Sequence, residues 1–268
     1  MTAILACVNL KGGVGKTTLA VNFAAYCGLK GHKTLLIDLD PQTNATLSCI
    51  SYEEWQAHSR KNGTVANLLG VRNHTSAEGD RKGPGDVIYP DVFKNVDLIP
   101  SHLDLFTVDL DLGAANARET LLKRALKPVL DDYDVVVCDC PPNLTIPTQN
   151  AIALSSHYVI PVSPDFLSSI GVGLLKNRIA VLAEALEVDI EPAGIVISRV
   201  GRTSYYRERT IQTLREEFDD VYDAVLTERS KVSEGTETQV SVFECGDRTA
   251  IQEFTAVSRK LLERIGVE

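Results

Sequence analysis

The stretch "NLKGGVGKTTLA", Asn9 to Ala20, decides the fold. It nearly fits the phosphate-binding loop pattern G-x-x-x-x-G-K-[ST], in which glycines let backbone amides close around phosphate groups. Leu10 replaces the first glycine of that pattern, and a second lysine, Lys11, stands five residues before the expected Lys16. A strand that ends in such a turn and runs into a helix places unpaired amides and the positive end of the helix dipole against an anion. The stretch therefore predicts an α/β fold around a phosphate site.

Short apolar runs rich in valine and isoleucine alternate with helical patterns along the rest of the chain. This alternation is typical of a parallel sheet covered by helices on both faces. The predicted strands are residues 3–10, 33–40, 96–101, 134–142, 157–164 and 192–200. The predicted helices are residues 16–29, 118–129, 146–154 and 167–186. We expect a doubly wound α/β fold with a mainly parallel sheet flanked by helices.

The length of 268 residues, 44% of them hydrophobic, fits one large domain or two small ones, and we expect one domain over residues 1–268. Residues 51–91 break the rhythm of strands and helices. This region holds the only tryptophan, Trp55, and the polar run "NHTSAEGDRKGPGD", which cannot bury anything. We expect that run to be a flexible surface excursion.

The composition limits where in the cell the protein is expected and which partners it can bind. A formal charge of -9 excludes a protein uniformly coated for nucleic acid but leaves room for a local basic patch. The six scattered cysteines predict buried free thiols, as in cytosolic proteins. No apolar run approaches the ~20 residues of a membrane span, and no charged leader precedes the first strand. The protein is expected to be cytoplasmic.

The loop residues have separable predicted roles. Gly12, Gly13 and Gly15 can take the backbone angles that the turn demands. Lys16 would neutralise the β and γ phosphates, the Thr17 hydroxyl would bind Mg²⁺, and Thr18 would reach the α phosphate. The predicted nucleotide-binding residues of the loop are Gly12, Gly13, Val14, Gly15, Lys16, Thr17 and Thr18.

Phosphoryl transfer also needs carboxylates near the metal, and two strand ends supply them. "LLIDLDPQTNAT" ends a strand with Asp38 and Asp40, and "VVVCDCPPN" ends another with Asp139. A buried carboxylate at Asp139 would be costly unless it served a cation. For Asp38, capping of a neighbouring helix is the alternative interpretation.

The motifs "KGGVGKTT", "DLDPQTNAT" and "DCPP", followed by "SKVSEGTETQVSVFE", resemble the ParA/Soj-type deviant Walker A partitioning ATPases of the MinD/ParA superfamily of P-loop ATPases. The resemblance runs over nearly the whole chain. It implies an ATP-dependent homodimerising switch that hydrolyses MgATP, binds DNA nonspecifically and partitions a chromosome, plasmid or other cargo. It also implies a ParB-like or cargo-adaptor protein that stimulates hydrolysis, and a nucleoid-associated location.

The resemblance gives the second lysine a role. Lys11 is similar to the signature lysine that crosses to the ATP of the second subunit, where a fixed cation stabilises transition-state charge. Gly12 would lie at the face between two nucleotides. Asp40 resembles the catalytic residue that orients the attacking water, so Lys11, Lys16 and Asp40 are the predicted catalytic residues.

Two further sets of site residues follow from the resemblance. Asp38 and Asp139 resemble residues that hold the waters of Mg²⁺, so that Thr17, Asp38 and Asp139 form the predicted metal site. Ser198 and Arg199 close the last predicted strand where the family has a base-contacting loop.

A basic segment, "SRVGRTSYYRER", holds four arginines against one acid at residues 198–209. Arginines can contact phosphates without reading sequence. Arg202 and Arg229 best match the DNA-binding positions of the family, and Arg207, Arg209 and Lys231 would widen the patch. The alternative is an ordinary solvated helix face, because glutamates follow closely.

The C-terminal tail places Ile251, Phe254, Leu261, Leu262 and Ile265 on a helical stripe that we expect to pack on the core, so no membrane binding is expected. A second function is kept open, namely a P-loop metabolic or maturation enzyme that acts on a small substrate without binding DNA. Such an enzyme would need a further substrate pocket.

Overall fold

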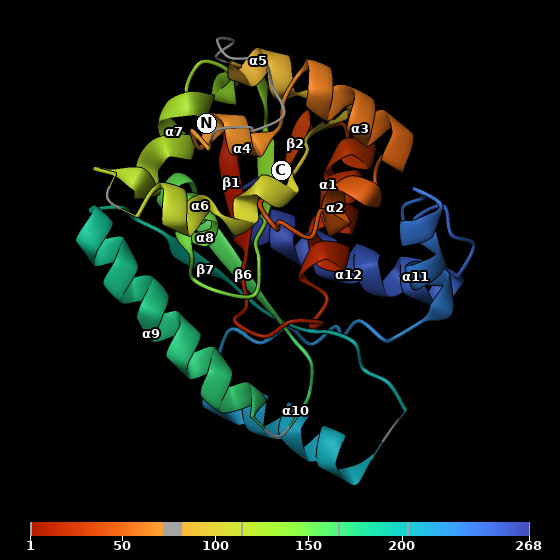
Figure 1. Cartoon of the computed structure of the whole chain (residues 1–268). Coiled ribbons are helices and arrows are strands. Elements are labelled where there is room, and N and C mark those ends of the chain that lie inside the picture. Colours follow the sequence, from red (N-terminus) through yellow and green to blue (C-terminus); the bar gives the residue numbers. More distant parts are fainter. Residues whose placement is uncertain (1, 72–81, 114, 166, 203, 268) are drawn as a thin grey trace.

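The computed structural model describes residues 2–71, 82–113, 115–165, 167–202 and 204–267. A sheet flanked by helices lies at its centre (Figure 1). The sheet has seven strands in the order β3-β4-β2-β5-β1-β6-β7. The strands are β1 (Ala3–Cys7), β2 (Thr34–Asp38), β3 (Tyr89–Phe93), β4 (Val96–Ile99), β5 (Val135–Asp139), β6 (His157–Val162) and β7 (Glu191–Ile197). The neighbouring strands pair in parallel, except β3, which is antiparallel to β4. The predicted mainly parallel sheet is confirmed.

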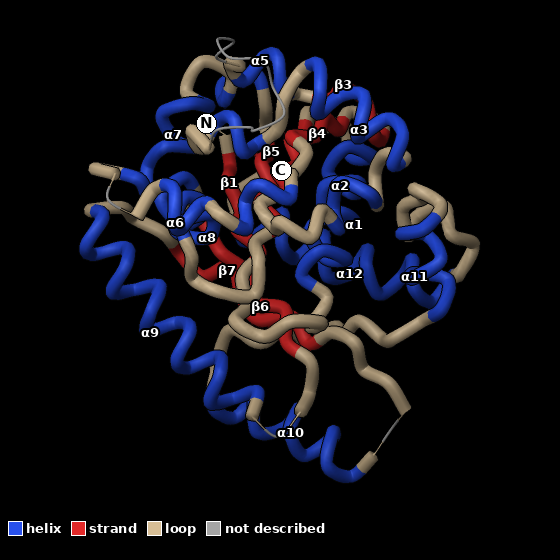
Figure 2. Tube along the Cα trace, viewed as in Figure 1, coloured by secondary structure: helices blue, strands red, loops and turns tan. Residues whose placement is uncertain are grey.

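Helices connect the strands and flank the sheet (Figure 2). The α-helices are α1 (Lys16–Lys30), α2 (Asn44–Leu47), α3 (Tyr52–Lys61), α4 (Val65–Leu68), α5 (Pro84–Val87), α6 (Val108–Asp111), α7 (Leu121–Leu126), α8 (Ile146–Leu154), α9 (Ser168–Leu186), α10 (Tyr205–Glu217), α11 (Ser230–Glu237) and α12 (Arg248–Arg264). Three 3-10 helices are η1 (Leu103–Phe106), η2 (Arg118–Thr120) and η3 (Leu130–Asp132) within the described parts of the chain.

The sheet is buried on both faces. Leu5 of β1 belongs to one apolar cluster with residues of α1 and α12, whereas its neighbour Ile4 belongs to another with residues of α7, α8 and α9. Successive strand residues point to opposite faces, so a strand covered on both sides must be apolar throughout. This explains the continuous apolar runs in the sequence and confirms the doubly wound arrangement.

The edge strand β3 was not predicted from the sequence. It contains Pro90, Asp91 has a positive φ of 55°, and most of its residues are partly or fully exposed. An exposed edge strand needs no alternating apolar pattern and tolerates proline, so its sequence carries little strand signal. The six predicted strands all occur, and each is shorter than its predicted range, while β7 begins one residue before that range.

Much of region 51–91 is helical. Trp55 on α3 is buried, and its indole nitrogen donates a hydrogen bond to the carbonyl of Ser101 at 2.9 Å. This tryptophan therefore anchors α3 beside the end of β4. Residues 72–81, which include most of the polar run, lie outside the described residues, and the flexible excursion stays a prediction.

The C-terminal stripe packs as expected. Phe254, Leu261, Leu262 and Ile265 are buried against the sheet and α1, and Ile251 is half-buried. Among the described residues, no helix combines the length and hydrophobicity needed to cross a bilayer.

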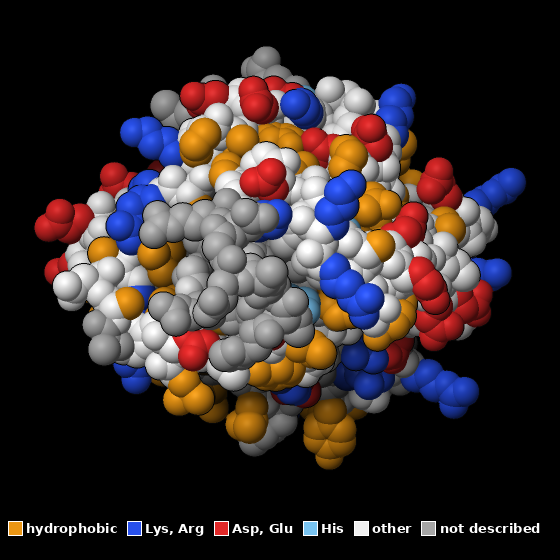
Figure 3. All heavy atoms as spheres, turned by 45° about the horizontal axis from the view of Figure 1, so that its top comes forward, with side chains coloured by type: hydrophobic (Ala, Val, Ile, Leu, Met, Phe, Trp, Pro, Cys, Tyr) orange, Lys and Arg blue, Asp and Glu red, His pale blue; other side chains and the backbone are white. Residues whose placement is uncertain are grey.

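The cysteines and the surface charges can be compared with the expectations from the composition. All six cysteines are free and five of them are buried, which confirms the prediction of buried thiols. On the face shown in Figure 3, acidic and basic side chains are intermixed, with hydrophobic side chains between them. The described side chains on that face therefore form no extended region of a single charge.

Candidate nucleotide-binding site

The loop between β1 and α1 has the backbone that a phosphate site needs. Gly13 and Gly15 have φ values of +73° and +85°, a region that side chains other than glycine rarely adopt. Gly12 has no positive φ, and a Cβ there would meet nothing within 4 Å. A side chain at position 12 would therefore fit within this single chain, so local packing does not explain the glycine.

Lys16 begins α1 and is nearly buried, with 6% of its surface exposed. Its ammonium group donates a hydrogen bond to the carbonyl of Lys11 at 3.1 Å, which holds the side chain along the loop. No acidic residue lies in the first turn of α1. The helix dipole and the lysine thus place positive charge at the same point.

A cavity of about 370 Å³ opens beside this loop. The loop, the end of β2, the segment after β7 and α11 form its walls. Predicted site residues that line it are Gly12, Gly13, Gly15, Lys16, Thr17, Thr18, Asp40, Ser198, Arg199 and Arg229. The structure thus brings together residues nearly 220 positions apart in the sequence, and the cavity has the size of a small-molecule site.

One end of the cavity is apolar and was missed by the sequence analysis. Leu226, Val232 and Phe254 line it, together with the polar residues Thr227 and Ser233. A flat base packs well against such side chains. Val232 lies within the quoted segment "SKVSEGTETQVSVFE", which was the one available signal for this wall.

Asp38 and Asp139 lie side by side as register partners on β2 and β5. Asp38 accepts hydrogen bonds from the Thr46 hydroxyl at 2.7 Å and from the Thr46 amide at 2.8 Å. Burial raises the pKa of Asp38 to about 7, although these hydrogen bonds oppose the rise. The alternative interpretation of Asp38, capping of a neighbouring helix, agrees with the bond from the Thr46 amide, which lies in the first turn of α2.

Asp139 is different, because in the described structure neither of its buried oxygens accepts a hydrogen bond of ordinary geometry. Burial, followed by the charge of Asp38, raises the pKa of Asp139 well above its ordinary range, and the nearby Thr17 hydroxyl lowers it in part. Two adjacent buried carboxylates beside a hydroxyl are costly unless a cation offsets their charge. No cluster of three or more histidine, cysteine or acidic side chains surrounds a metal position among the described residues. The donor set suits Mg²⁺, which keeps several of its waters.

Ser198 and Arg199 follow β7 and contact the loop itself. The Ser198 hydroxyl donates to the carbonyl of Val14 at 2.5 Å, and the Arg199 guanidinium donates to the carbonyl of Gly13 at 2.8 Å. Arg199 also pairs with Glu228. These side chains hold the loop backbone and also line the cavity, and their contact with adenine stays a prediction.

Lys11 is exposed and pairs with Asp165, which follows β6. Asp165 also accepts a hydrogen bond from the Ser163 hydroxyl at 2.8 Å. Partial burial raises the pKa of Asp165, but the hydrogen bonds from Lys11 and Ser163 lower it below its ordinary value. The Lys11 side chain therefore lies away from the main cavity, against the start of α9.

The predicted DNA-binding residues come from two separate parts of the chain, around α10 and at the start of α11. Arg202 and Lys231 are exposed, and Lys231 pairs with Glu234 at 3.6 Å. Arg207 is half-buried and donates to the carbonyl of Arg202 at 2.5 Å. Figure 1 shows α10, which carries Arg207, well apart from α11, which carries Lys231.

Arg229 is turned inward. It lines the nucleotide cavity and its guanidinium lies 3.4 Å from Asp247 and 3.5 Å from Glu253. Its Nε donates to the Thr227 hydroxyl at 2.9 Å. The geometry of this chain gives Arg229 a structural role in the cavity wall, while DNA contact by it stays a prediction.

Comparisons with known proteins agree with this geometry. A family model described as an AAA domain matches residues 2–192. The chain is 32% identical to the sporulation initiation inhibitor protein Soj of Bacillus subtilis over 235 residues, covering 87% of each protein. It is also 32% identical to an uncharacterized protein of Mycobacterium tuberculosis, covering 98% of this chain and 80% of that protein.

Solved structures share the fold. McdA of Cyanothece without nucleotide has a TM-score of 0.82 at 21% identity, covering 97% of this chain and 100% of that chain. A putative plasmid partition protein of Borrelia burgdorferi bound to AMPPNP has a TM-score of 0.81 at 22% identity, covering 98% and 100%.

Cobyrinic acid a,c-diamide synthase of Mycobacterium smegmatis, bound to an ATP analogue and magnesium, has a TM-score of 0.72 at 25% identity, covering 89% and 93%. Proteins of this fold thus bind nucleotide and magnesium. The chain therefore belongs to the Soj/ParA family of P-loop ATPases, as its identity to Soj shows and as its phosphate loop and paired carboxylates lead one to expect.

Proposed function

We propose that this ATPase is a dimerising switch, which hydrolyses MgATP to ADP and phosphate and binds DNA nonspecifically while ATP is bound. It would partition a chromosome, plasmid or other cargo together with a ParB-like or cargo-adaptor protein, in the cytoplasm and on the nucleoid. One observation carries the proposal. The phosphate loop and Lys16 line a cavity, whereas Lys11 of the same loop points away from it and pairs with Asp165.

ATP binding rests on the loop and on Lys16. The loop amides and the Lys16 ammonium would hold the phosphates, and the apolar end at Leu226, Val232 and Phe254 would hold the base. Thr17, Asp38 and Asp139 would hold magnesium, the two carboxylates through water. Magnesium, when bound, neutralises charge that develops on the phosphates.

Asp40 is the residue we assign to orienting the attacking water. It lines the cavity, its carboxylate accepts a hydrogen bond from the Gln42 amide at 2.9 Å, and its carbonyl accepts one from the Ser101 hydroxyl at 2.7 Å. These two contacts hold the nearly buried residue in the wall of the cavity. A fixed carboxylate can hold a water in the direction that phosphoryl transfer requires.

Lys11 would act in trans. In one protomer it pairs with Asp165, and in the ATP dimer it would exchange this partner for the triphosphate held by the other protomer. A fixed cation at developing phosphate charge has the effect of an arginine finger. ATP would favour the dimer through this contact, because the monomer does not make it.

The replacement Lys11→Ala tests this proposal. We expect the variant to bind ATP but to lose the ATP-dependent dimer, and to lose stimulated hydrolysis by roughly 10³-fold or more. Light scattering and phosphate release measure the two effects. Lys260→Ala is the matched control, because Lys260 is also an exposed lysine in an ion pair, with Glu263. A Lys11→Ala protein that dimerises and hydrolyses normally would overturn the mechanism.

DNA binding has its own prediction. We expect Arg202→Ala to weaken binding of unrelated duplexes about equally and to reduce the slope of log affinity against log salt by about 1. Gel shifts with ATP over a salt series measure both. Arg259→Ala, which removes an exposed arginine on α12, should leave the slope unchanged. An unchanged slope for Arg202→Ala would exclude this arginine from the interface.

A second candidate function is an enzyme that acts on a small substrate. The similarity of fold to the Mycobacterium smegmatis diamide synthase, at 25% identity, favours it. The same gel shift separates the two functions, since such an enzyme should show no ATP-dependent DNA binding.

A further inference from the structure

Two tyrosines at the start of α10 are exposed to solvent. Tyr205 and Tyr206 are 69% and 80% exposed, and their rings form an edge-to-face pair with centroids 5.7 Å apart and planes inclined by 76°. An edge-to-face pair covers at most one ring face, so open aromatic faces remain. Figure 1 shows α10 at the lower margin of the molecule. The fold therefore places two aromatic rings where a ligand can reach them.

Packing does not explain these rings. Further along α10, Leu214 is buried and Ile211 is half-buried against the core, whereas the first turn extends beyond the core. Among the described residues, no hydrogen bond reaches either tyrosine hydroxyl, although a tyrosine used by the fold usually has such a partner. Adjacent exposed aromatic side chains of this kind indicate an interaction site.

Two free guanidinium groups flank the tyrosine pair. Arg209 lies four residues after Tyr205 and three after Tyr206, a spacing that makes its side chain a neighbour of both rings on the helix surface. Arg202 lies in the loop just before α10, and both arginines are exposed. Within the described part of the chain, neither guanidinium forms an ion pair or a hydrogen bond.

The loop that carries Arg202 is held against the helix. The Arg207 guanidinium donates a hydrogen bond to the carbonyl of Arg202 at 2.5 Å, and a Cβ at Gly201 would lie 3.1 Å from the same guanidinium. The Arg207 amide donates to the Ser204 hydroxyl at 3.3 Å, which caps α10. Arg207 therefore keeps the loop beside the helical turn that carries the tyrosines.

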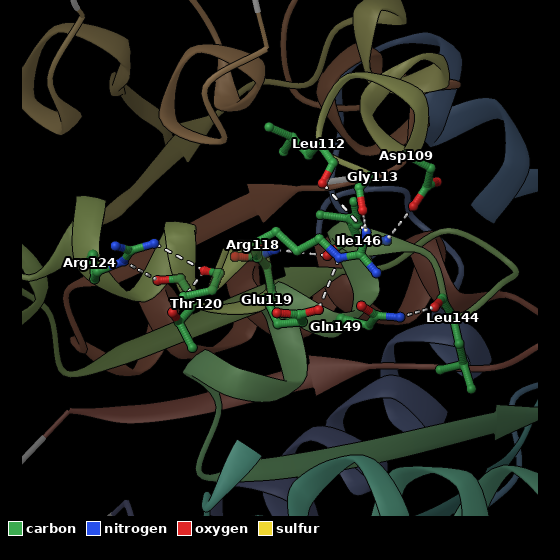
Figure 4. Close-up of polar contacts among 12 residues, drawn as sticks. Asp109, Leu112, Gly113, Arg118, Glu119, Thr120, Arg124, Leu144, Ile146 and Gln149 are labelled. Atoms are coloured by element: carbon green, nitrogen blue, oxygen red, sulfur yellow. Dashed lines mark hydrogen bonds and ion pairs between the residues drawn. The ribbon is translucent and has the colours of Figure 1, made fainter. Parts of the chain in front are cut away.

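An arginine elsewhere in the chain shows the contrast. The Arg118 guanidinium donates to the carbonyls of Leu112 and Gly113 and thereby holds the chain just after α6 (Figure 4). The hydrogen-bonding groups of such an arginine are used by the fold. Arg202 and Arg209 have no such role, so their guanidinium groups are available to an external anion.

Charge and aromatic faces together define the ligand. Residues 198–209 hold four arginines and one glutamate, so a second copy of this chain docking through the same segment would bring like charges together. Guanidinium groups suit phosphates, and exposed rings suit flat bases. A duplex offers phosphates and base edges but keeps its base faces within the stack, whereas a single strand offers phosphates and open base faces. A single-stranded nucleic acid fits both features.

We propose that Tyr205 and Tyr206, together with Arg202 and Arg209, form a binding site for unpaired bases of a single-stranded nucleic acid. This inference rests on the proposed function, because it names the form of nucleic acid that the basic segment would prefer. The open ring faces would stack on bases, and the arginines would bind the neighbouring phosphates. Stacking tolerates every base, so the site would bind without regard to sequence.

Three nucleic acids test this site. The first is a DNA single strand of mixed sequence and about 20 nucleotides, which exceeds common site sizes for single strands. The second is an RNA strand of the same sequence, and the third is the DNA duplex. Fluorescence anisotropy over a salt series, with ATP and with ADP, measures the affinity of the protein for each.

The variants separate the rings from other effects. Tyr205→Ala with Tyr206→Ala removes both rings, and Tyr205→Phe with Tyr206→Phe keeps them. Tyr52→Ala is the matched control, since Tyr52 also begins a helix, α3, after a serine cap and is 53% exposed, but is followed by Glu53 and Glu54. Alanine suits the first turn of a helix, so thermal unfolding should stay close to that of the wild type.

We expect the double alanine variant to bind the single strands at least tenfold more weakly than the wild type, because stacking contributes about fivefold or more per base. The slope of log affinity against log salt should not change, since tyrosine carries no charge. Duplex binding by this variant, and all binding by the double phenylalanine variant and by Tyr52→Ala, should stay within about threefold of the wild type. Arg209→Ala should instead reduce the salt slope for single-stranded DNA by about 0.7.

Binding of either single strand through the tyrosines supports the inference, and the stronger of the two identifies the preferred nucleic acid. The inference is wrong if the wild type binds neither single strand, if the double alanine variant binds them as tightly as the wild type, or if its duplex affinity falls by the same factor. ATP-dependent duplex binding by the wild type reports separately on the proposed function. Its absence would reject the DNA-binding switch and leave the single-strand result readable.

Discussion

Replacement of Lys16 by alanine is expected to abolish ATP binding, with a loss of affinity of at least about 100-fold, which corresponds to roughly 2.8 kcal/mol. The Lys16 ammonium is nearly buried, lies along the phosphate loop and lines the cavity. Removing it leaves the phosphates without their only buried cation among the described cavity residues. Titration with a fluorescent ATP analogue measures the affinity.

The control separates this effect from a loss of folding. Alanine is compatible with the first turn of α1, and the hydrogen bond to the Lys11 carbonyl is one contact of the loop among several. The thermal unfolding temperature without nucleotide should therefore change little, whereas the stabilisation by added ATP should disappear. An ATP affinity within threefold of the wild type would show that Lys16 does not contact the phosphates.

The second large effect is expected for Asp40→Ala, which should retain ATP binding and trap the ATP dimer. Loss of a positioned carboxylate at the attacking water typically slows a reaction by 10²–10⁴-fold, and we expect a fall in this range for stimulated hydrolysis. Size-exclusion chromatography with ATP should show a dimer that persists, since it is dismantled by hydrolysis in the proposed cycle.

ATP affinity is the internal control for Asp40→Ala. The variant loses the hydrogen bond from the Gln42 amide, but the bond from Ser101 goes to the backbone carbonyl and can remain. A variant that hydrolyses ATP at the wild-type rate would exclude Asp40 from the chemistry. A variant that fails to bind ATP would assign the residue to binding.

The sequence predicted those parts of the site that are encoded locally. The glycines with positive φ, Lys16 and Thr17 lie within one short motif, so their placement follows from the motif alone. The adjacency of Asp38 and Asp139 was also accessible, because both end buried strands of a parallel sheet, and the carboxyl ends of such strands share one edge.

Contacts between distant segments outside the sheet were not predicted. The apolar end of the cavity joins Leu226 and Val232 to Phe254, which the sequence analysis treated only as a core residue of the last helix. Arg229 looked like a surface arginine, and its ion pairs with Asp247 and Glu253 depend on how α11 meets α12. No spacing rule in a sequence reports such contacts, because they depend on tertiary packing.

The ion pair between Lys11 and Asp165 affects the free energy of dimer formation in the proposed cycle. Both side chains are substantially exposed, and exposed ion pairs contribute only about 0.2–1 kcal/mol each. Two protomers that release these pairs together give up ~2 kcal/mol at most, which is about a 30-fold change in the association constant. The ion pair with Asp165 therefore opposes dimer formation only weakly. It orients the Lys11 ammonium in the monomer, and it would break readily when the triphosphate of a second protomer comes within reach.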